Sequence, residues 1–418
     1  MTDKPIPPAG GAAGPLRDLR VIELGSTVAG PFCARLLADF GADVIKIEQA
    51  DGDAVRSFSH RKDGRSLYNA SMQRGKRIAS VNLRTDKGRD LARQLCETAD
   101  IVVENFRPGT LEGWGLGYAD LSAVNSGLIM VRVSGFGQDG PYSRRGGYGV
   151  VCEAVSGLRE ITGDPDRPPP RMATSLTDYI AGLYAAFGTV MAVHERSRTG
   201  RGQVVDSALY EGAFSFMEPH IPVFQQLGIV AERAGSHLPG NAPNSIYPSR
   251  DGHYIILAAA SNAVFRRLAT AMGRPDLSTD PLFESAVARA ENMAACDDAV
   301  AAWTRTLDLG ELETTLDAAK VPAARIYTVA DIFDDPHYQA RQMLVDVDDP
   351  NLGPITMTGI VPKLSDTPGA IRWSGRDIGA DTRDVLQTEL HMEDSAINGL
   401  ARDGVLHGNG LPPEGDVE

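Results

Sequence analysis

The sequence predicts an α/β chain in which a large Rossmann-like domain, built on a parallel sheet, is accompanied by a smaller α+β domain. Strands alternate with helices through the first part of the chain, which is the pattern of a doubly wound parallel sheet. The chain has 418 residues, more than one compact core usually holds. Its middle changes to a polar stretch broken by glycine and proline, and several amphipathic helices follow.

The predicted strands are β-branched apolar runs, and the segments between them show the apolar spacing of helices. The first unit reads "LRVIEL", "GPFCARLLADFG" and "ADVIKIE", and its helix ends at Gly41, a common helix terminator. The second reads "RIASVNL", "DKGRDLARQLCETA" and "DIVVENF", and "LIMVRVSGFG" adds a further strand. A long apolar helix is expected over 178–197. We expect a disordered lead-in over 1–15, a large domain over 16–225 and a small domain over 226–335.

Composition excludes several classes of protein. The formal net charge is −14, whereas a nucleic-acid-binding protein needs a basic surface. The four cysteines are far apart and form no CxxC pair, so a reducing cytoplasm is expected and a zinc site or disulfide framework is not. No signal peptide and no apolar run long enough to span a membrane is recognised. We therefore expect a cytoplasmic protein with no nucleic-acid partner, no membrane partner and no metal.

The first glycine turn matches a dinucleotide-binding fingerprint only in part. Gly25 and Gly30 stand where the first and third glycines of G-x-G-x-x-G belong, and Glu48 stands where a ribose-binding acid would. The middle position is Thr27, whose side chain blocks the approach of a pyrophosphate. We expect a tight strand-to-helix turn here, without NAD.

Several longer motifs, occurring in the family's order, resemble the family III CoA-transferases, which include formyl-CoA transferase. The motifs are "LRVIELGSTVAGPFCARLLADFGADVIKIE", "GKRIASVNLRTDKGRD", "DIVVENFRPGTLEGWGL", "VSGFGQDGPY", "TDYIAGLYAAFGTVMAVHERSRTGRGQVVDSAL", "PKLSDTPGAI" and "IGADTRDVL". The resemblance spans roughly residues 15 to 406. It implies a homodimer of two interlocked chains, a C-terminal segment over 336–406 that returns to the large domain, and a tail over 407–418.

Asp178 begins the long helix, and an acid at a helix start is usually a cap or a partner of the helix dipole. The resemblance implies instead that Asp178 is the catalytic nucleophile. It would attack an acyl-CoA thioester, form an aspartyl-acyl anhydride and then an aspartyl-CoA thioester, and pass CoA to a free acid. This route needs neither ATP nor metal. The implied partners are an acyl-CoA substrate and a small carboxylic acid, with no permanently bound cofactor.

Other residues are assigned by the same resemblance. Two basic positions of the formyl-CoA transferases are replaced by Gln49 and Gly113, so Lys76 or Arg77 is a candidate for the CoA phosphates. The loop "GSHLPGNAPN" is either a lid over the nucleophile or a mobile surface loop. The implied CoA-binding residues are Val28, Ala29, Val81, Arg84, Asn105 and Phe106, and the implied lid residues are His237, Gly240 and Asn241.

The function expected from this resemblance is transfer of CoA to a short polar acid or a dicarboxylate of the succinate, malate or itaconate type. Arg144, Arg145 and Arg171 could meet a distal carboxylate, or could be solvated surface residues. One alternative is an α-methylacyl-CoA racemase, which needs a second acid–base group where this chain has Tyr148. The other is a non-catalytic acyl-CoA-binding protein, against which the presence of Asp178 argues.

Overall fold

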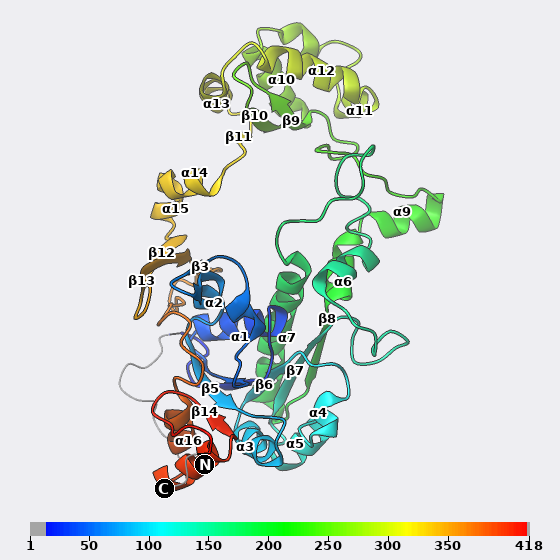
Figure 1. The fold of residues 1–418 in the computed structure, drawn as a ribbon. Helices are drawn as coiled ribbons and strands as arrows, with labels where there is room; N and C mark the ends of the chain where they lie inside the picture. The colour runs from blue at the N-terminus through cyan, green and yellow to red at the C-terminus, as the bar shows by residue number, and fades with distance from the viewer. Residues whose placement is uncertain (1–13, 416–418) are drawn as a thin grey trace. The chain divides into compact units, whose positions relative to one another are not determined.

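The computed structural model describes residues 14–415, so most of the predicted lead-in and the last tail residues lie outside the described part. The chain divides into two compact units (Figure 1). The large unit comprises the described residues up to Leu158, Met172–Ile221 and the described residues from Ala340 onward, and the small unit comprises Arg159–Arg171 and Pro222–Gln339.

The division differs in one segment from the continuous large domain expected over 16–225. Arg159–Arg171 groups with the small unit. Gly163 explains this grouping, because it forms a β-bridge with Gly235, a small-unit residue. The contact joins positions far apart in sequence, so no local pattern announces it.

A seven-stranded sheet organises the large unit, in the order β14-β5-β2-β1-β6-β7-β8. All neighbours pair in parallel except β14, which is antiparallel to β5. Counted among themselves, the six parallel strands follow the order 3-2-1-4-5-6 of doubly wound sheets. The predicted parallel sheet of an α/β protein is confirmed. The strands are β1 (Arg20–Glu23), β2 (Asp43–Glu48), β5 (Lys76–Val81), β6 (Ile101–Glu104), β7 (Ile129–Ser134), β8 (Val204–Ala208) and β14 (Leu406–His407).

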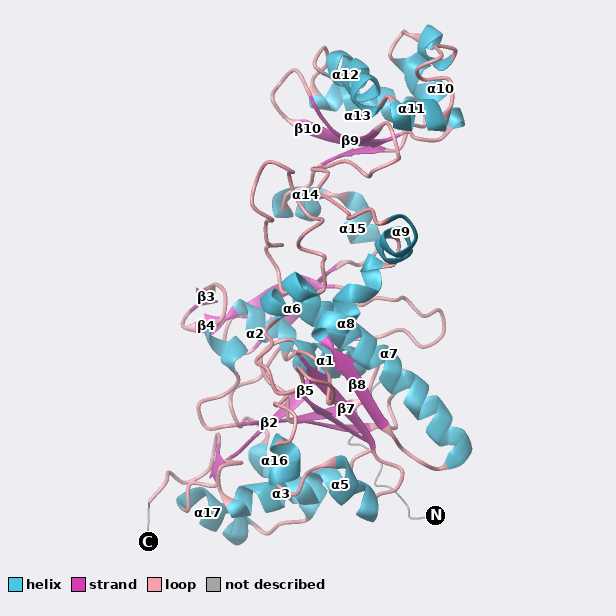
Figure 2. Ribbon diagram, turned by 90° about the vertical axis from the view of Figure 1, so that its right-hand side faces the viewer, coloured by secondary structure: helices cyan, strands magenta, loops and turns pink. Residues whose placement is uncertain are grey.

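Helices cover both faces of this sheet (Figure 2). Successive strand residues point to opposite faces, so Val21 enters the core under α1 and α7, while Ile22 enters the core under α3, α5, α16 and α17. Both faces are therefore apolar, which explains the continuous apolar runs in the sequence. The covering helices are α1 (Ala29–Asp39), α3 (Asp86–Glu97), α5 (Tyr118–Val124), α7 (Leu176–Thr199), α16 (Thr382–Leu390) and α17 (Asp394–Arg402).

Residues near the C-terminus complete the sheet. Leu406 pairs with Val81 in the β14–β5 ladder, and the Asp381 carboxylate accepts the backbone N–H of Ile78 at 2.8 Å. The remaining elements of the large unit are η1 (Ala54–Ser57), β3 (Arg61–Lys62), β4 (Arg65–Ser66), α2 (Leu67–Met72), α4 (Thr110–Gly113), α6 (Gly149–Val155), α8 (Leu209–Phe214), η2 (Ser215–Met217), β12 (Leu344–Asp349) and β13 (Gly353–Thr358).

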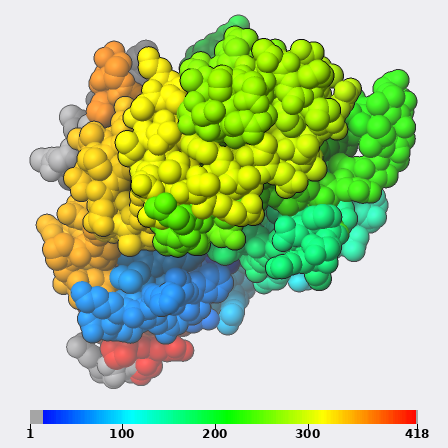
Figure 3. All heavy atoms as spheres, turned by 90° about the horizontal axis from the view of Figure 1, so that it is seen from above, coloured from blue at the N-terminus to red at the C-terminus, as the bar shows by residue number. Residues whose placement is uncertain are grey.

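The small unit packs helices on one face of a three-stranded antiparallel sheet, ordered β11-β10-β9. Its core gathers Tyr247, Phe265 and Leu312. Figure 3 shows one face of the atoms around this core, coloured yellow-green to yellow. Its elements are β9 (Asn244–Pro248), β10 (Tyr254–Ala258), α10 (Asn262–Ala271), η3 (Pro275–Ser278), α11 (Ala286–Glu291), α12 (Met293–Thr304), α13 (Leu309–Ala318), β11 (Ala323–Arg325) and α14 (Val329–Asp334); α9 (His220–Leu227) and α15 (Pro336–Ala340) lie at the junctions.

Helix α7 is long and apolar enough, by length and composition, to span a membrane, contrary to the expectation that no such run exists. Core helices of globular proteins pass the same test. One face of α7 packs closely on α1, where a side chain at Gly182 would lie 2.7 Å from the carbonyl oxygen of Ala29. The opposite face exposes Leu183 and Phe187 at 58% and 60%.

Candidate active site

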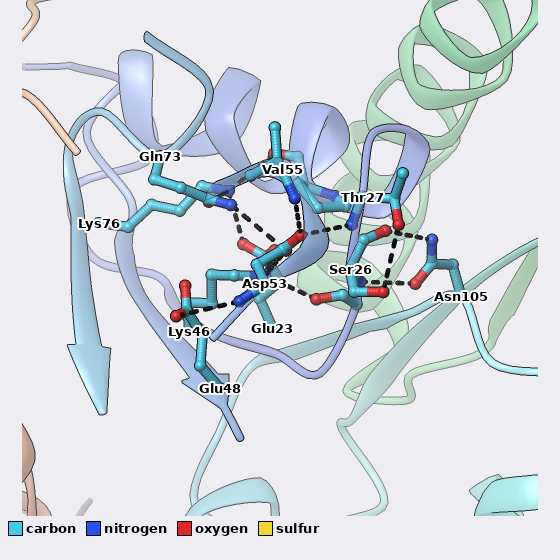
Figure 4. A network of polar contacts seen from close by, with 12 residues as sticks. Glu23, Ser26, Thr27, Lys46, Glu48, Asp53, Val55, Gln73, Lys76 and Asn105 are labelled. Carbon is cyan, nitrogen blue, oxygen red and sulfur yellow. Dashed lines mark hydrogen bonds and ion pairs between the residues drawn. The ribbon is translucent and has the colours of Figure 1, made fainter. Parts of the chain in front are cut away.

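A buried charge network fixes the glycine turn that follows β1 (Figure 4). The Lys46 ammonium lies 2.7 Å from Glu23 and 2.8 Å from Asp53, and donates to the carbonyl oxygen of Gly25 at 2.6 Å. The Lys76 ammonium lies 2.7 Å from the second oxygen of Glu23. Burial alone would lower the pKa of Lys46, but the carboxylates of Glu23 and Asp53 outweigh burial and raise it. Burial lowers the pKa of Lys76 to about 8, although Glu23 opposes the shift.

The turn itself holds Thr27 in a left-handed conformation, with φ at +73°, which is unusual for a β-branched residue. Its backbone N–H donates to Asp53 at 2.8 Å. The Asn105 side chain accepts from the N–H of Ser26 and donates to the Ser26 carbonyl, both at 2.8 Å (Figure 4). Position 25 favours glycine because Asn105 occupies the space beside it. A Cβ atom at this position would lie 3.1 Å from the Asn105 side-chain oxygen.

Asp178 lies in the first turn of α7, at the edge of the sheet where the parallel strands end. Ser175 occupies the N-cap position, so Asp178 is not the cap. The residue is half-buried, and the positive end of the helix dipole favours its ionised form by about 0.3–1 kcal/mol. A partly exposed carboxylate at such a position is suited to nucleophilic attack.

Helix α6 begins directly against this carboxylate. A side chain built at Gly149 would place its Cβ atom 2.1 Å from Oδ2 of Asp178 and 2.7 Å from Oγ1 of Thr177. Only glycine fits such a contact. Tyr148, the residue before it, is 77% exposed. The backbone of α6 therefore sets the position of the Asp178 carboxylate.

Two tyrosines stand beside Asp178. The hydroxyl groups of Tyr68 and Tyr179 are 2.8 Å apart, and the Tyr179 ring packs edge-on against Phe32 with a centroid separation of 4.7 Å. Burial, the hydrogen bond to Tyr179 and the charges of Tyr179 and Asp178 raise the pKa of Tyr68, so it remains a neutral hydroxyl. Burial and the Asp178 charge raise the pKa of the Cys152 thiol to about 11, so Cys152 is not a competing thiolate nucleophile.

The residues implied to bind CoA lie at the carboxyl ends of three parallel strands, where open α/β sheets bind ligands. Val28 and Ala29 follow β1, Val81 ends β5, and Asn105 and Phe106 follow β6. Their side chains differ in availability. Val28, Ala29 and Val81 are buried, Arg84 is exposed, Phe106 packs on Trp114 at 5.2 Å, and the Asn105 amide is bound to Ser26.

Lys76 and Arg77, the two candidates for the CoA phosphates, are both engaged by groups of the protein itself. Lys76 is fully buried and engaged by Glu23, by Gln73 and by the carbonyl of Pro31. Arg77 is paired with Asp43 at 2.6 Å and with Glu389 at 2.7 Å. Both charges therefore form contacts within the large unit, and that either residue binds a CoA phosphate stays a prediction. The sequence could not show this, because the partners come from distant elements.

The predicted lid residues belong to the small unit, where the loop is anchored at both ends. The His237 ring lies 3.2 Å from the Asp297 carboxylate, which also accepts the hydroxyl of Tyr247. At the other end, the buried Arg289 donates to the carbonyl oxygen of Ala242 at 3.1 Å. Gly240 and Asn241, between these anchors, are exposed. That this loop covers Asp178 stays a prediction, because the two groups belong to different units.

Sequence reasoning missed Gly149, Tyr68 and Tyr179. Gly149 lies in the run "GGYGVV", where only the replacement of a racemase histidine by Tyr148 drew attention. Tyr179 is adjacent to Asp178, but a tyrosine on an apolar helix is usually a core residue. Tyr68 is distant in sequence, and only the fold brings it to the site.

Comparisons with known proteins show the family of this chain. The model of CoA-transferase family III matches residues 16–382. The chain is 48% identical to succinyl-CoA–D-citramalate CoA-transferase of Chloroflexus aurantiacus, over 92% of this chain and 96% of that protein. It is 39% identical to succinyl-CoA:mesaconate CoA-transferase of Haloarcula hispanica, over 85% and 91%. A crystal structure of a CAIB/BAIF family protein from Brucella suis has a TM-score of 0.81 at 32% identity, covering 90% of this chain and 100% of that one. The chain belongs to CoA-transferase family III and is a CoA-transferase.

Proposed function

We propose that this protein transfers CoA from a dicarboxylic acyl-CoA to a second dicarboxylic acid, with Asp178 as the covalent carrier. The observation that supports it most is the Asp178 carboxylate, held against Gly149 at the ligand-binding edge of the sheet. The two relatives named above are described as acting on succinyl-CoA with citramalate or mesaconate, and all three acyl groups carry a second carboxylate.

In the proposed mechanism every step exchanges one acyl bond for another. The Asp178 carboxylate attacks the thioester carbonyl, and the C–S bond breaks. CoA departs as a thiolate, and the acyl group remains on Asp178 as a mixed anhydride. The thiolate then attacks the Asp178 carbonyl carbon, releasing the donor acid and forming aspartyl-CoA. The acceptor carboxylate attacks that thioester and expels the thiolate, which finally attacks the acceptor's acyl carbon and frees Asp178.

Two further features fit these steps. We propose, from the family resemblance, that the loop carrying Gly240 and Asn241 acts as a lid whose backbone N–H groups stabilise the oxyanions that form on the way. Buried Val28 and its neighbour Ala29 form a wall that limits access of water, which would hydrolyse the anhydride. The four free cysteines support a reducing, cytoplasmic setting.

A matrix of acyl-CoA donors against free acids in heavy water tests this function. We expect succinyl-CoA to pass CoA to dicarboxylic acids, seen as new acyl-CoA masses. We also expect no enzyme-dependent deuterium at the α-carbon of a 2-methylacyl-CoA, because Tyr148 is an exposed phenol where a racemase needs an acid–base group. Deuterium exchange near the turnover rate, without CoA transfer, would establish the racemase instead.

We further propose that two chains form an interlocked homodimer. The edge strand β8 and the outer face of α7 line a groove, and four apolar side chains on that face are exposed: Leu183 58%, Phe187 60%, Val190 47% and Met191 52%. An unpaired edge strand beside an apolar helical face is typical of an interface. The chain also leaves the large unit after Ile221 and returns to it at Ala340. The long intervening segment, Pro222–Gln339, is the part with which a second chain would interlock.

The dimer is expected to persist on dilution to low nanomolar concentration, because an interlocked pair cannot separate without unfolding. Phe187→Asp should prevent assembly, since it places a charge in the proposed interface. Val124→Asp, at an equally exposed apolar residue on α5, should assemble normally. Analytical ultracentrifugation measures both. An active monomer of the unaltered protein would contradict the proposal.

A further inference from the structure

Arg35 is a half-buried arginine whose charge is poorly compensated. Its side chain is only 13% exposed, and its Nε atom has no hydrogen-bond partner among the described residues. Arg35 pairs with Asp39, whose carboxylate lies 3.7 Å from that nitrogen. Both oxygens of Asp39 already accept hydrogen bonds from Arg74, one from Nε at 2.9 Å and one from Nη2 at 2.7 Å. A guanidinium that is largely, although not fully, removed from water and has no closely bound acid is costly unless something else binds it.

The location of Arg35 connects it to the nucleophile. Its guanidinium carbon lies 4.6 Å from the centre of the Phe32 ring, and Phe32 packs against Tyr179, the residue after Asp178. Tyr68, hydrogen-bonded to Tyr179, is close enough to Asp178 and to Arg35 for both charges to act on the pKa of its hydroxyl. Burial lowers the pKa of Arg35 to about 10, so it remains charged at neutral pH.

A dicarboxylate has the charge that this arrangement lacks. When one of its carboxylates reacts with Asp178, the other keeps its charge and enters the site with the substrate. Buried carboxylates require a charged partner, and the planar arginine fork binds them with two parallel hydrogen bonds. Arg144 and Arg145, the other candidates in this unit, are exposed, and Arg145 stacks on the Tyr142 ring at 4.5 Å.

We propose that Arg35 binds the distal carboxylate of the acyl donor and of the acceptor acid, and so restricts the enzyme to dicarboxylic acids. This inference depends on the transferase function proposed above. Phe32 and the two tyrosines would then line the space between the nucleophile and the guanidinium, with their apolar surfaces against the carbon chain and their hydroxyls near the reacting carboxyl group.

The test compares glutarate with its monoamide as acceptors, which have the same shape but differ in the distal charge. Succinyl-CoA is kept saturating, because kcat/KM for the acceptor then reports only the half-reaction of the covalent enzyme. We expect Arg35→Gln to lower the ratio of kcat/KM for glutarate over the monoamide by about ten- to a hundredfold. The ratio for Arg35→Lys should lie between those of the unaltered enzyme and Arg35→Gln, because lysine keeps the charge but lacks the planar guanidinium.

Arg196→Gln is the matched control. Arg196 has a similar exposure, with 18% of its side chain exposed. It lies in the last turn of α7, far from Asp178 in the first turn, and it pairs with Asp100. Its ratio should equal that of the unaltered enzyme. An unchanged ratio in Arg35→Gln, or equal losses with both acceptors, would overturn the role of Arg35 while the transferase function stands. Failure of the unaltered enzyme to transfer CoA to any acid would overturn both.

Discussion

Asp178→Asn is expected to lower CoA transfer by about 10³-fold or more, while the protein stays folded and binds CoA. The amide is nearly the same size as the carboxylate, but it cannot form an anhydride, so the covalent route is closed. Its effect on stability should be small, because Asp178 lies in the first turn and not at the N-cap position of α7, and the amide keeps the size of the carboxylate and its ability to accept hydrogen bonds. Steady-state assays, thermal unfolding and CoA titration measure the three properties.

Asp120→Asn provides the matched control for this variant. Asp120 occupies the same position in the first turn of α5 that Asp178 occupies in α7. If both acids act only on helix dipoles, both substitutions should have the same small effect. We expect Asp120→Asn to keep full activity. Substantial transfer by Asp178→Asn would mean that Asp178 is a structural residue.

Gly149→Ala is expected to lower kcat by about a hundredfold, because displacing a reacting group by roughly an ångström has an effect of this size. The new methyl group would lie 2.1 Å from Oδ2 of Asp178, so the carboxylate has to move. Folding should survive, because the obstructing atoms are the end of a side chain and not the backbone. Activity assays should therefore show a large loss, whereas the thermal unfolding midpoint should change little.

Gly146→Ala, in the loop that precedes α6, separates this steric effect from a general loss of flexibility. A side chain at Gly146 meets only the end of Arg107, at 4.0 Å. Its activity should match that of the unaltered protein. Equal activity of Gly149→Ala and the unaltered enzyme would show that the Asp178 carboxylate is not positioned by α6.

The parallel sheet was predictable because its signal is local. Alternate apolar residues such as Val21 and Ile22 enter cores on opposite faces, and a strand buried on both sides reads as a continuous apolar run. The rejection of a dinucleotide fingerprint rested on one side chain, Thr27. The structure adds that Asn105 occupies the space beside Gly25, so the glycines serve a packing contact within the turn.

The site was only partly predictable because its contacts join distant positions. Nothing near Gly149 in sequence indicates that it touches Asp178, and nothing near Lys76 indicates that Glu23 engages it within the core. The charge of Arg35 is poorly compensated because Arg74 binds the Asp39 carboxylate at shorter distances. Each of these facts depends on how separate elements pack, and hydrophobic periodicity carries no information about it.

The central claim is that Asp178 forms covalent bonds to acyl groups and to CoA. Its most direct test is the mass of the intact protein after incubation with succinyl-CoA and no acceptor. We predict an added mass equal to CoA or to the acyl group, removal of that mass by hydroxylamine, and a hydroxamate on the peptide that contains residue 178. Asp178→Asn should gain no mass. An adduct on another residue, or turnover with no adduct at all, would contradict the covalent role of Asp178.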